Sequence, residues 1–82
     1  MMPLRVTYDE VANVAYIYLQ PPGTRVAKMY PCDPVDVGGM INLDFDATGH
    51  LVGVEVLDAR AKLAPVLLAA AEDVRRRAPD VR

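Results

Sequence analysis

The sequence predicts a single α+β domain over residues 1–82, in which a small antiparallel β-sheet of about five strands carries one C-terminal helix. Three observations predict this class. Apolar and polar residues alternate along residues 40–58 on both sides of a turn, which is the pattern of a β-hairpin. Two segments before residue 20 alternate in the same way. After Asp58 apolar residues recur every three or four positions, which indicates a helix, so the expected order is β-β-β-β-β-α.

The first two strands are expected over residues 4–8 and 14–19, joined by a short polar connection. Asp9 opens this connection and is placed to cap the backbone amides two or three residues later. In the second strand Tyr16 and Tyr18 face away from the apolar residues of the same strand. A Pro-Pro-Gly sequence then stops this strand, because proline cannot donate a hydrogen bond to a ladder.

A third and less regular strand is expected over residues 25–30. Lys28 lies on one of its faces, which suits a strand at the edge of a sheet. The next segment, residues 31–39, contains two prolines, two glycines and two aspartates and is predicted to be a loop.

The fourth and fifth strands flank an Asp-Ala-Thr-Gly turn. Asp46 is expected to accept backbone hydrogen bonds at the start of this turn, and Gly49 is expected to take the left-handed conformation that closes it. The two strands present one apolar row each to the same core, made of Ile41, Leu43, Phe45, Val52, Val54 and Val56.

The C-terminal helix is expected over residues 65–77, after a short turn at residues 59–64. Pro65 is acceptable in the first helical turn, where its missing N–H has no intrahelical partner. The three arginines at residues 75–77 lie in the last turn, where cations are favourable.

The composition bounds the possible functions. An 82-residue chain is close to the size at which burial only just offsets conformational entropy. Hydrophobic residues make up 52% of the chain, which excludes intrinsic disorder and leaves more apolar surface than a small monomer can bury. We therefore expect a homo-oligomer, either a dimer or a higher assembly. The net charge of −2 offers no positive field, so nucleic-acid binding is not expected.

The sequence also suggests a compartment. No apolar run approaches the length that spans a bilayer, and the first residues lead into a strand pattern, so we expect a cytoplasmic protein that does not bind membranes. Cys32 is the one cysteine, which fits a reducing compartment. No cysteine and histidine spacing indicates a metal site, and no cofactor is predicted.

The hairpin matches a calcium-binding pattern in part. Asp44, Asp46, Gly49 and Glu55 take four positions of an EF-hand loop, while Thr48 departs from the usual residue type. An EF-hand loop needs a helix before it, whereas the preceding segment carries prolines and glycines. We therefore expect no metal here.

Neither a nucleophile with its base nor a phosphate-binding glycine loop is found. The remaining candidate for catalysis or ligand binding is a polar cluster at Asp9, Asn13, Tyr16, Asp44, Asp46, His50 and Glu55. General acid–base chemistry needs a shielded pocket that shifts pKa values, and a hairpin tip normally stands in solvent. The arginines at residues 75–77 could contact phosphates, but they already suit a helix end.

Both faces of the predicted sheet are partly apolar. One helix can cover one face, so the other face is expected to meet a partner through aromatic anchors. Two copies could thus meet sheet face to sheet face through the tyrosines, or helix to helix through the small residues. Simple solvent exposure is the alternative. The residues predicted to mediate self-association are Tyr16, Tyr18, Leu51, Leu57, Leu67, Leu68 and Ala71.

Several segments carry a family resemblance: Tyr8-Asp9, Ala15-Tyr16-Ile17, the turn Asp44-x-Asp46-x-x-Gly49, and Gly53-Val54-Glu55-Val56-Leu57-Asp58. On these residues the chain resembles the YuzE-like family of small bacterial domains of unknown function, over residues 4–63. The resemblance implies a compact α+β domain without an assigned activity, sometimes encoded in operons that look like toxin–antitoxin pairs. Family members commonly carry Asp where Asn13 stands here, which weakens the case for a metal in this loop.

These observations favour a non-catalytic module for protein interaction or self-assembly over an enzyme. The resemblance implies that the module could be antitoxin-like, with a small partner protein from the same operon. The alternative is a ligand-binding or enzymatic domain with an acidic site near the hairpin turn. Geometry separates the two, because an enzyme needs several of the polar side chains to converge in a partly buried pocket.

Overall fold

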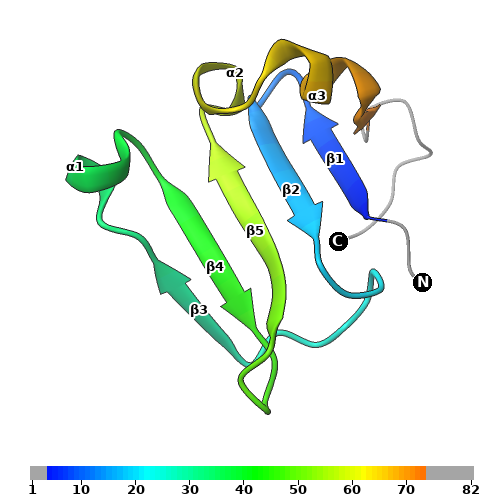
Figure 1. Cartoon of the computed structure of the whole chain (residues 1–82), viewed down its shortest axis with the longest axis vertical. Helices are drawn as coiled ribbons and strands as arrows, with labels where there is room; N and C mark the ends of the chain where they lie inside the picture. The colour runs from blue at the N-terminus through cyan, green and yellow to red at the C-terminus, as the bar shows by residue number, and fades with distance from the viewer. Residues whose placement is uncertain (1–3, 74–82) are drawn as a thin grey trace.

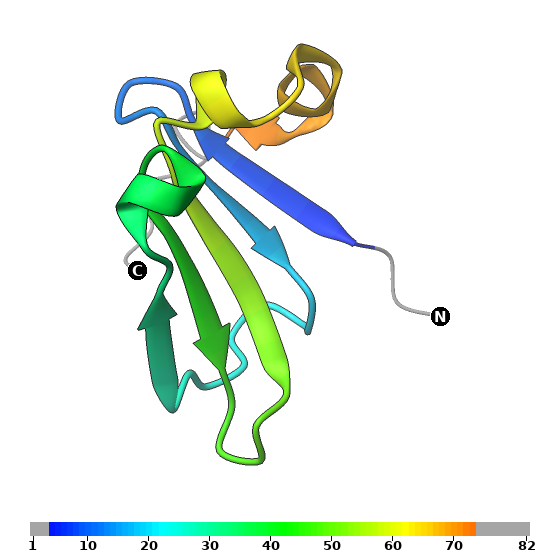
Figure 2. The ribbon, with the colours of Figure 1, turned by 60° about the vertical axis from the view of Figure 1, so that its left-hand side comes forward.

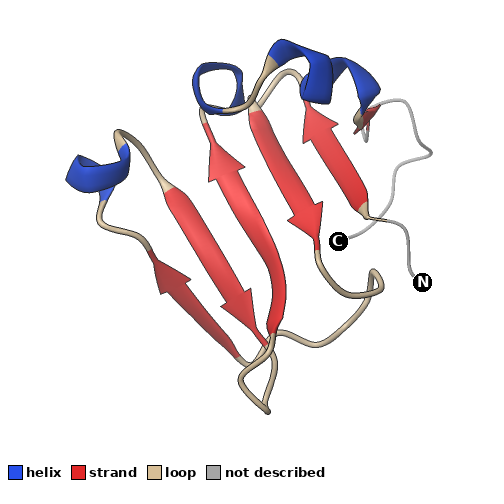
Figure 3. Cartoon of the chain, in the orientation of Figure 1, coloured by secondary structure: helices blue, strands red, loops and turns tan. Residues whose placement is uncertain are grey.

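The computed structural model describes residues 4–73. The elements in chain order are β1 (Arg5–Asp9), β2 (Val14–Tyr18), β3 (Lys28–Pro31), α1 (Pro34–Val37), β4 (Ile41–Phe45), β5 (Leu51–Leu57), α2 (Ala59–Lys62), α3 (Pro65–Ala70) and β6 (Glu72–Asp73). The strands form one sheet in the order β3-β4-β5-β2-β1-β6 (Figure 1). The helices gather at the end of the sheet where β4 begins and β5 ends (Figure 3).

The predicted central hairpin is confirmed. β4 and β5 pair antiparallel, with Ile41 opposite Val56, and a bulge between Asp44 and Phe45 shifts the register before the turn. β2 pairs antiparallel with both β1 and β5, so the two hairpins join into one sheet. Since β3 follows β2 in the chain but pairs with β4, residues 19–27 pass from β2 across the end of the sheet to β3 (Figure 2).

The prediction of five antiparallel strands and one C-terminal helix is wrong in both counts. Residues 4–73 contain six strands and three short helices, and the sheet is mixed because β6 runs parallel to β1. Within these residues no helix has the length and apolar character needed to cross a membrane.

The helix expected over residues 65–77 ends early. α3 stops at Ala70 and Ala71 is extended, because Glu72 then pairs with the outer edge of β1 opposite Thr7. An ion pair of 2.9 Å between Arg5 Nε and Glu72 Oε1 supports this pairing. Pairing with an open strand therefore outweighs the local preference for helix. The rest of the predicted helix, including the arginines at residues 75–77, lies outside the described residues.

The segment between β3 and β4 is more regular than the predicted loop. Asp33 caps the helical turn α1 by accepting the amide of Val35 at 2.9 Å, and Pro34 takes the first helical turn. Gly38 ends the turn with φ 67°, the left-handed conformation that suits glycine. The prolines and glycines of this segment led to the prediction of a loop, although Asp33, Pro34 and Gly38 are residues typical of helix ends.

Two other boundaries differ from the prediction. β3 begins at Lys28 rather than at residue 25 and includes Pro31, because its extent is set by pairing with β4. Proline is acceptable there because β3 is an edge strand. The short turn expected over residues 59–64 contains the single helical turn α2.

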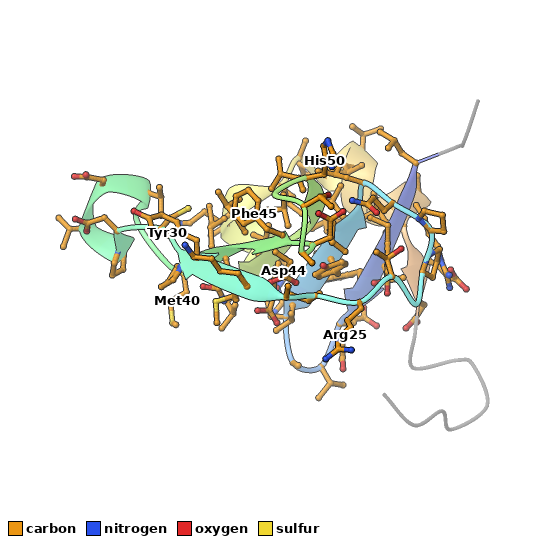
Figure 4. All side chains as sticks on the ribbon, turned by 90° about the horizontal axis from the view of Figure 1, so that it is seen from below. Arg25, Tyr30, Met40, Asp44, Phe45 and His50 are labelled. Carbon is orange, nitrogen blue, oxygen red and sulfur yellow. The ribbon has the colours of Figure 1, made fainter. Side chains whose placement is uncertain are left out.

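The sheet has two different faces. On one face Ala15 and Val56 are buried with Ala59 of α2, and this small core is the centre of packing for partly buried neighbours such as Leu63 and Leu68. The opposite face, which we call the polar face, carries Tyr16, Tyr18, Asn42, Asp44 and Glu55, which share one side of the sheet through their register. Figure 4 shows Tyr30 and Phe45 on the side of the core and Asp44 on the polar face.

Candidate functional site

The polar face is organised around Tyr16. The Tyr16 hydroxyl donates to Asp44 Oδ2 at 2.7 Å, although β5 lies between their two strands. Gly53 of β5 makes this bond possible, because a Cβ atom there would lie 2.5 Å from the Tyr16 ring. Burial, followed by the hydrogen bond to Asp44, raises the pKa of the Tyr16 phenol well above its ordinary value. Tyr16 therefore remains a neutral hydrogen-bond donor near neutral pH.

Neighbouring side chains extend the same network. Asn42, which is 8% exposed, donates from Nδ2 to Glu55 Oε1 at 2.9 Å. The rings of Tyr16 and Tyr18 meet edge to face with centroids 4.7 Å apart, and the Arg5 guanidinium lies 5.4 Å from the Tyr18 centroid. In the described part of the chain, no buried side-chain nitrogen or oxygen lacks a hydrogen-bond partner. This satisfied network fixes the geometry of the face.

The hairpin turn is held by one carboxylate. Asp46 Oδ1 accepts the amides of Thr48 and His50 at 3.0 and 2.9 Å and the Thr48 hydroxyl at 2.8 Å, while Oδ2 accepts Gln20 Nε2 at 3.0 Å. These hydrogen bonds, with that of Gln20 the largest influence, lower the pKa of Asp46. His50 Nδ1 lies 2.8 Å from the Thr48 hydroxyl. The predicted role of Asp46 as a backbone acceptor is confirmed.

This arrangement predicts an acid-sensitive turn. The pKa of Asp46 is lowered in the folded protein, so its ionised carboxylate stabilises the fold. This contribution is complete above the ordinary carboxyl pKa of about 4 and is lost as the pH falls below that value. We expect Asp46→Asn to lower the urea midpoint at neutral pH, and this difference from wild type should narrow on acidification. Glu10→Gln is the matched control, since it neutralises an exposed carboxylate of the β1–β2 turn, at the opposite end of the sheet from Asp46 (Figure 1). A constant difference for Asp46→Asn between about pH 6 and pH 2.5 would contradict the prediction.

A second polar centre joins the β1–β2 turn to α2. Asn13 has φ 59° and donates from Nδ2 to Asp58 Oδ1 at 2.9 Å. Its Oδ1 accepts the Arg60 amide at 2.9 Å and the Tyr8 hydroxyl at 3.2 Å. Arg60 Nη1 also donates to the Tyr8 hydroxyl at 3.0 Å. These hydrogen bonds hold the β1–β2 turn to α2, and they occupy both polar groups of the Asn13 side chain.

The seven polar candidates from the sequence fall into three separate groups. The groups are Tyr16, Asp44 and Glu55 on the polar face, Asp46 and His50 in the hairpin turn, and Asp9 and Asn13 in the β1–β2 turn. The two turns lie at opposite ends of the sheet (Figure 1). Asp9 Oδ1 accepts the amides of the residues two and three positions later, as predicted. The structure therefore brings together parts of the candidate set, but not the set as a whole.

The sequence prediction assigned no role in a site to Gly53, Asp58 or Arg60, although Gly53 and Asp58 belong to a segment that carries the family resemblance. Gly53 had one available signal, as a glycine inside a strand pattern marks close approach of another group. The partners of Asn13 lie 45 and 47 positions away in the sequence, so no local pattern indicated them. Only the pairing of β2 with β5 brings these residues together.

Comparison with protein families identifies one match. Residues 5–60 match the family described as "Protein of unknown function (DUF2283)". The chain belongs to this family. Comparison with curated proteins and with solved structures found no match. The DUF2283 match includes β1 to β5, the polar face, the hairpin turn and Asn13, whereas α3 and β6 follow it.

The protein also has a surface hollow of about 760 Å³ between the end of β1 and α3, the latter beyond the residues matched by the family. Its lining includes Tyr8, Arg60 and Leu68, but none of the seven polar candidates. Within residues 4–73, no group of three or more His, Cys, Asp or Glu side chains is placed to hold a metal ion.

The residues predicted to mediate self-association have different surroundings in the domain. Tyr16 and Tyr18 pack against each other on the polar face, and Leu68 packs against the core. Leu51 is 39% exposed beside the hairpin turn. Leu57, Leu67 and Ala71 are half-buried. Larger apolar exposure lies elsewhere, at Leu4, Val11, Val35 and Val66 and at Met29 and Tyr30 of β3.

Proposed function

We propose that this DUF2283 chain is a non-catalytic interaction module that assembles with itself. The observation that supports this proposal is the imbalance between core and surface. The buried apolar side chains of residues 4–73 are Ala15, Val52, Val56 and Ala59. The large apolar side chains exposed in the same residues are Leu4, Val11, Val26, Met29, Tyr30, Val35, Met40, Leu51 and Val66. A second copy that covers some of them would add apolar burial to a domain with little of its own.

The arrangement of polar groups weighs against an acidic catalytic site near the hairpin turn. Asp46 uses both carboxylate oxygens for hydrogen bonds to the protein itself, and Asp44 accepts from Tyr16. His50 is exposed to solvent at the turn, whereas general acid–base chemistry needs a shielded pocket. An enzyme needs groups that converge on a substrate, whereas these groups converge on one another.

An antitoxin-like role is a further proposal within the interaction class, and it rests on the YuzE-like resemblance. It requires a small partner protein encoded beside this chain. Co-expression of the native operon with an affinity tag on this chain is the direct test. A stoichiometric small protein that remains bound through purification would support the role, and recovery of this chain alone would contradict it.

Self-assembly gives a direct prediction. Sedimentation equilibrium at micromolar concentration should give a mass of two or more chains, because association removes exposed apolar surface from water. The apparent mass should rise with concentration until the assembly saturates. A mass of one chain that stays constant on concentration would mean that the apolar surface is tolerated in a monomer, and the proposal would be wrong.

A further inference from the structure

The edge strand β3 is the most exposed part of the sheet. All four of its residues are exposed, with Met29 at 52% and Tyr30 at 55%, and nearby Val26 is 41% exposed. β3 pairs with β4 on one side only and forms one border of the sheet (Figure 1). Apolar groups are therefore exposed on both sides of an open strand, since Met29 and Tyr30 point to opposite faces.

The open edge offers few backbone hydrogen-bond donors. The Cys32 amide donates to Ile41 of β4 at 2.8 Å. Because backbone groups alternate in an antiparallel ladder, Tyr30 also faces β4, whereas Met29 and Pro31 face outward. Proline has no N–H, so Met29 supplies the outward N–H of β3, with its own carbonyl beside it. One residue can thus form two reciprocal hydrogen bonds with its own copy about a two-fold axis.

Charge is distributed unevenly along this segment. Two basic residues, Arg25 and Lys28, precede Met29, and two acidic residues, Asp33 and Asp36, follow it. The ion pair found in residues 4–73 joins Arg5 to Glu72, so Arg25, Lys28 and Asp36 make no ion pair within the described residues. A segment with a basic start and an acidic end is complementary to itself when two copies run antiparallel.

We propose that two copies of this chain pair antiparallel through their β3 edges, about a two-fold axis near Met29. This proposal rests on the proposed function and specifies its surface. Reciprocal Met29 backbone hydrogen bonds join the two sheets, and Arg25 and Lys28 of each copy lie beside the acidic end of the other. Tyr30 of each copy lies on the same face as Lys28 of its partner and covers its apolar stem.

Lys28 and Pro31 also limit the pairing. Lysine and proline on an edge strand are features that oppose indiscriminate strand addition. In this geometry Pro31 ends the backbone pairing, and Lys28 accepts a partner only where the opposite segment supplies negative charge. The expected assembly is a closed dimer of modest affinity that dissociates as salt is added, because salt screens the four charged ends.

Two charge variants test the proposal. The acidic variant, Arg25→Glu with Lys28→Glu, makes both ends negative, and the basic variant, Asp33→Asn with Asp36→Lys, makes both ends positive. Asparagine retains an oxygen that can cap α1. Each variant alone should raise the dimer dissociation constant about tenfold or more, because attraction becomes repulsion. An equimolar mixture should form a 1:1 heterodimer with an affinity close to that of wild type.

Sedimentation velocity at low and high salt provides the measurement, and circular dichroism verifies that each variant is folded. Val66→Lys on α3 is the matched control, since Val66 is 77% exposed and lies away from β3, and it should leave the dimer intact. Variants that dimerise like wild type, or a mixture that remains monomeric, would overturn this surface while self-assembly stands. A wild-type chain that is monomeric throughout would overturn both proposals.

Discussion

Replacement of Gly53 by alanine is expected to destabilise the domain by about 2–3 kcal/mol, the upper part of the range for an added group in a well-packed region. The added Cβ would lie 2.5 Å from both Cε2 and Oη of Tyr16. The ring would have to move, and it would then lose its hydrogen bond to Asp44 and its edge contact with Tyr18. Urea unfolding at neutral pH measures the change.

A double-mutant cycle separates this steric cause from a general preference for glycine. In a Tyr16→Thr background the ring is absent and the strand keeps a β-branched residue. Gly53→Ala should then cost less than about 1 kcal/mol, which leaves a large coupling energy between the two positions. Equal effects in both backgrounds would show that the ring is not what excludes a side chain at Gly53.

The hairpin and its turn could be predicted because their signals are local. Apolar alternation places Ile41 and Val56 on one face without knowledge of the rest of the chain. Asp46 and Gly49 act in the turn that they define, with Gly49 at φ 90°. Asp9 likewise caps the β1–β2 turn, which begins directly after it in the sequence. These residues, whose partners lie within a few positions, were thus assigned correctly, whereas the equally local cap of α1 by Asp33 was missed.

Most features that could not be predicted from the sequence depend on contacts between residues that are distant in the chain. Ala71 and Glu72 follow a sequence that favours helix, yet the open edge of β1 makes Glu72 a strand residue. The Tyr16 to Asp44 bond spans 28 positions and requires the strand order β4-β5-β2. Alternation did place Tyr16, Asp44 and Glu55 among polar residues, but only the register shows that they share one face.

The same limit explains why the candidate residues did not form one site. His50, Asp44 and Glu55 are close in sequence, which suggested a cluster near the turn. In the structure the bulge after Asp44 and the turn at Asp46 separate His50 from the polar face. Proximity in a hairpin sequence is therefore a weak predictor of a shared pocket, because alternation and the turn direct neighbours to different places.

Asn13→Ala is expected to destabilise the domain by about 2–3 kcal/mol, through backbone strain and lost hydrogen bonds together. Asn13 has φ 59°, a conformation that asparagine tolerates better than alanine. The substitution also leaves the Arg60 amide and the Asp58 carboxylate without their Asn13 partners. Asn13→Gly restores backbone freedom alone, so it should recover part of the loss in chemical denaturation. Equal stability of the alanine and glycine variants would exclude the backbone contribution.

Asn13→Asp tests the Nδ2 donor of this side chain, because aspartate has nearly the same shape. The substitution should destabilise the domain to an extent that depends on pH. The aspartate can still accept the Arg60 amide, but it replaces the Nδ2 donor, 2.9 Å from Asp58 Oδ1, with a second carboxylate. Two adjacent carboxylates repel and raise each other's pKa, so the penalty should be greatest at neutral pH and shrink below about pH 5 as one of them takes a proton. Urea midpoints of wild type and variant at pH 7 and pH 4 measure this convergence. A penalty that is constant, or that grows on acidification, would show that the Asn13 to Asp58 contact does not hold the β1–β2 turn to α2.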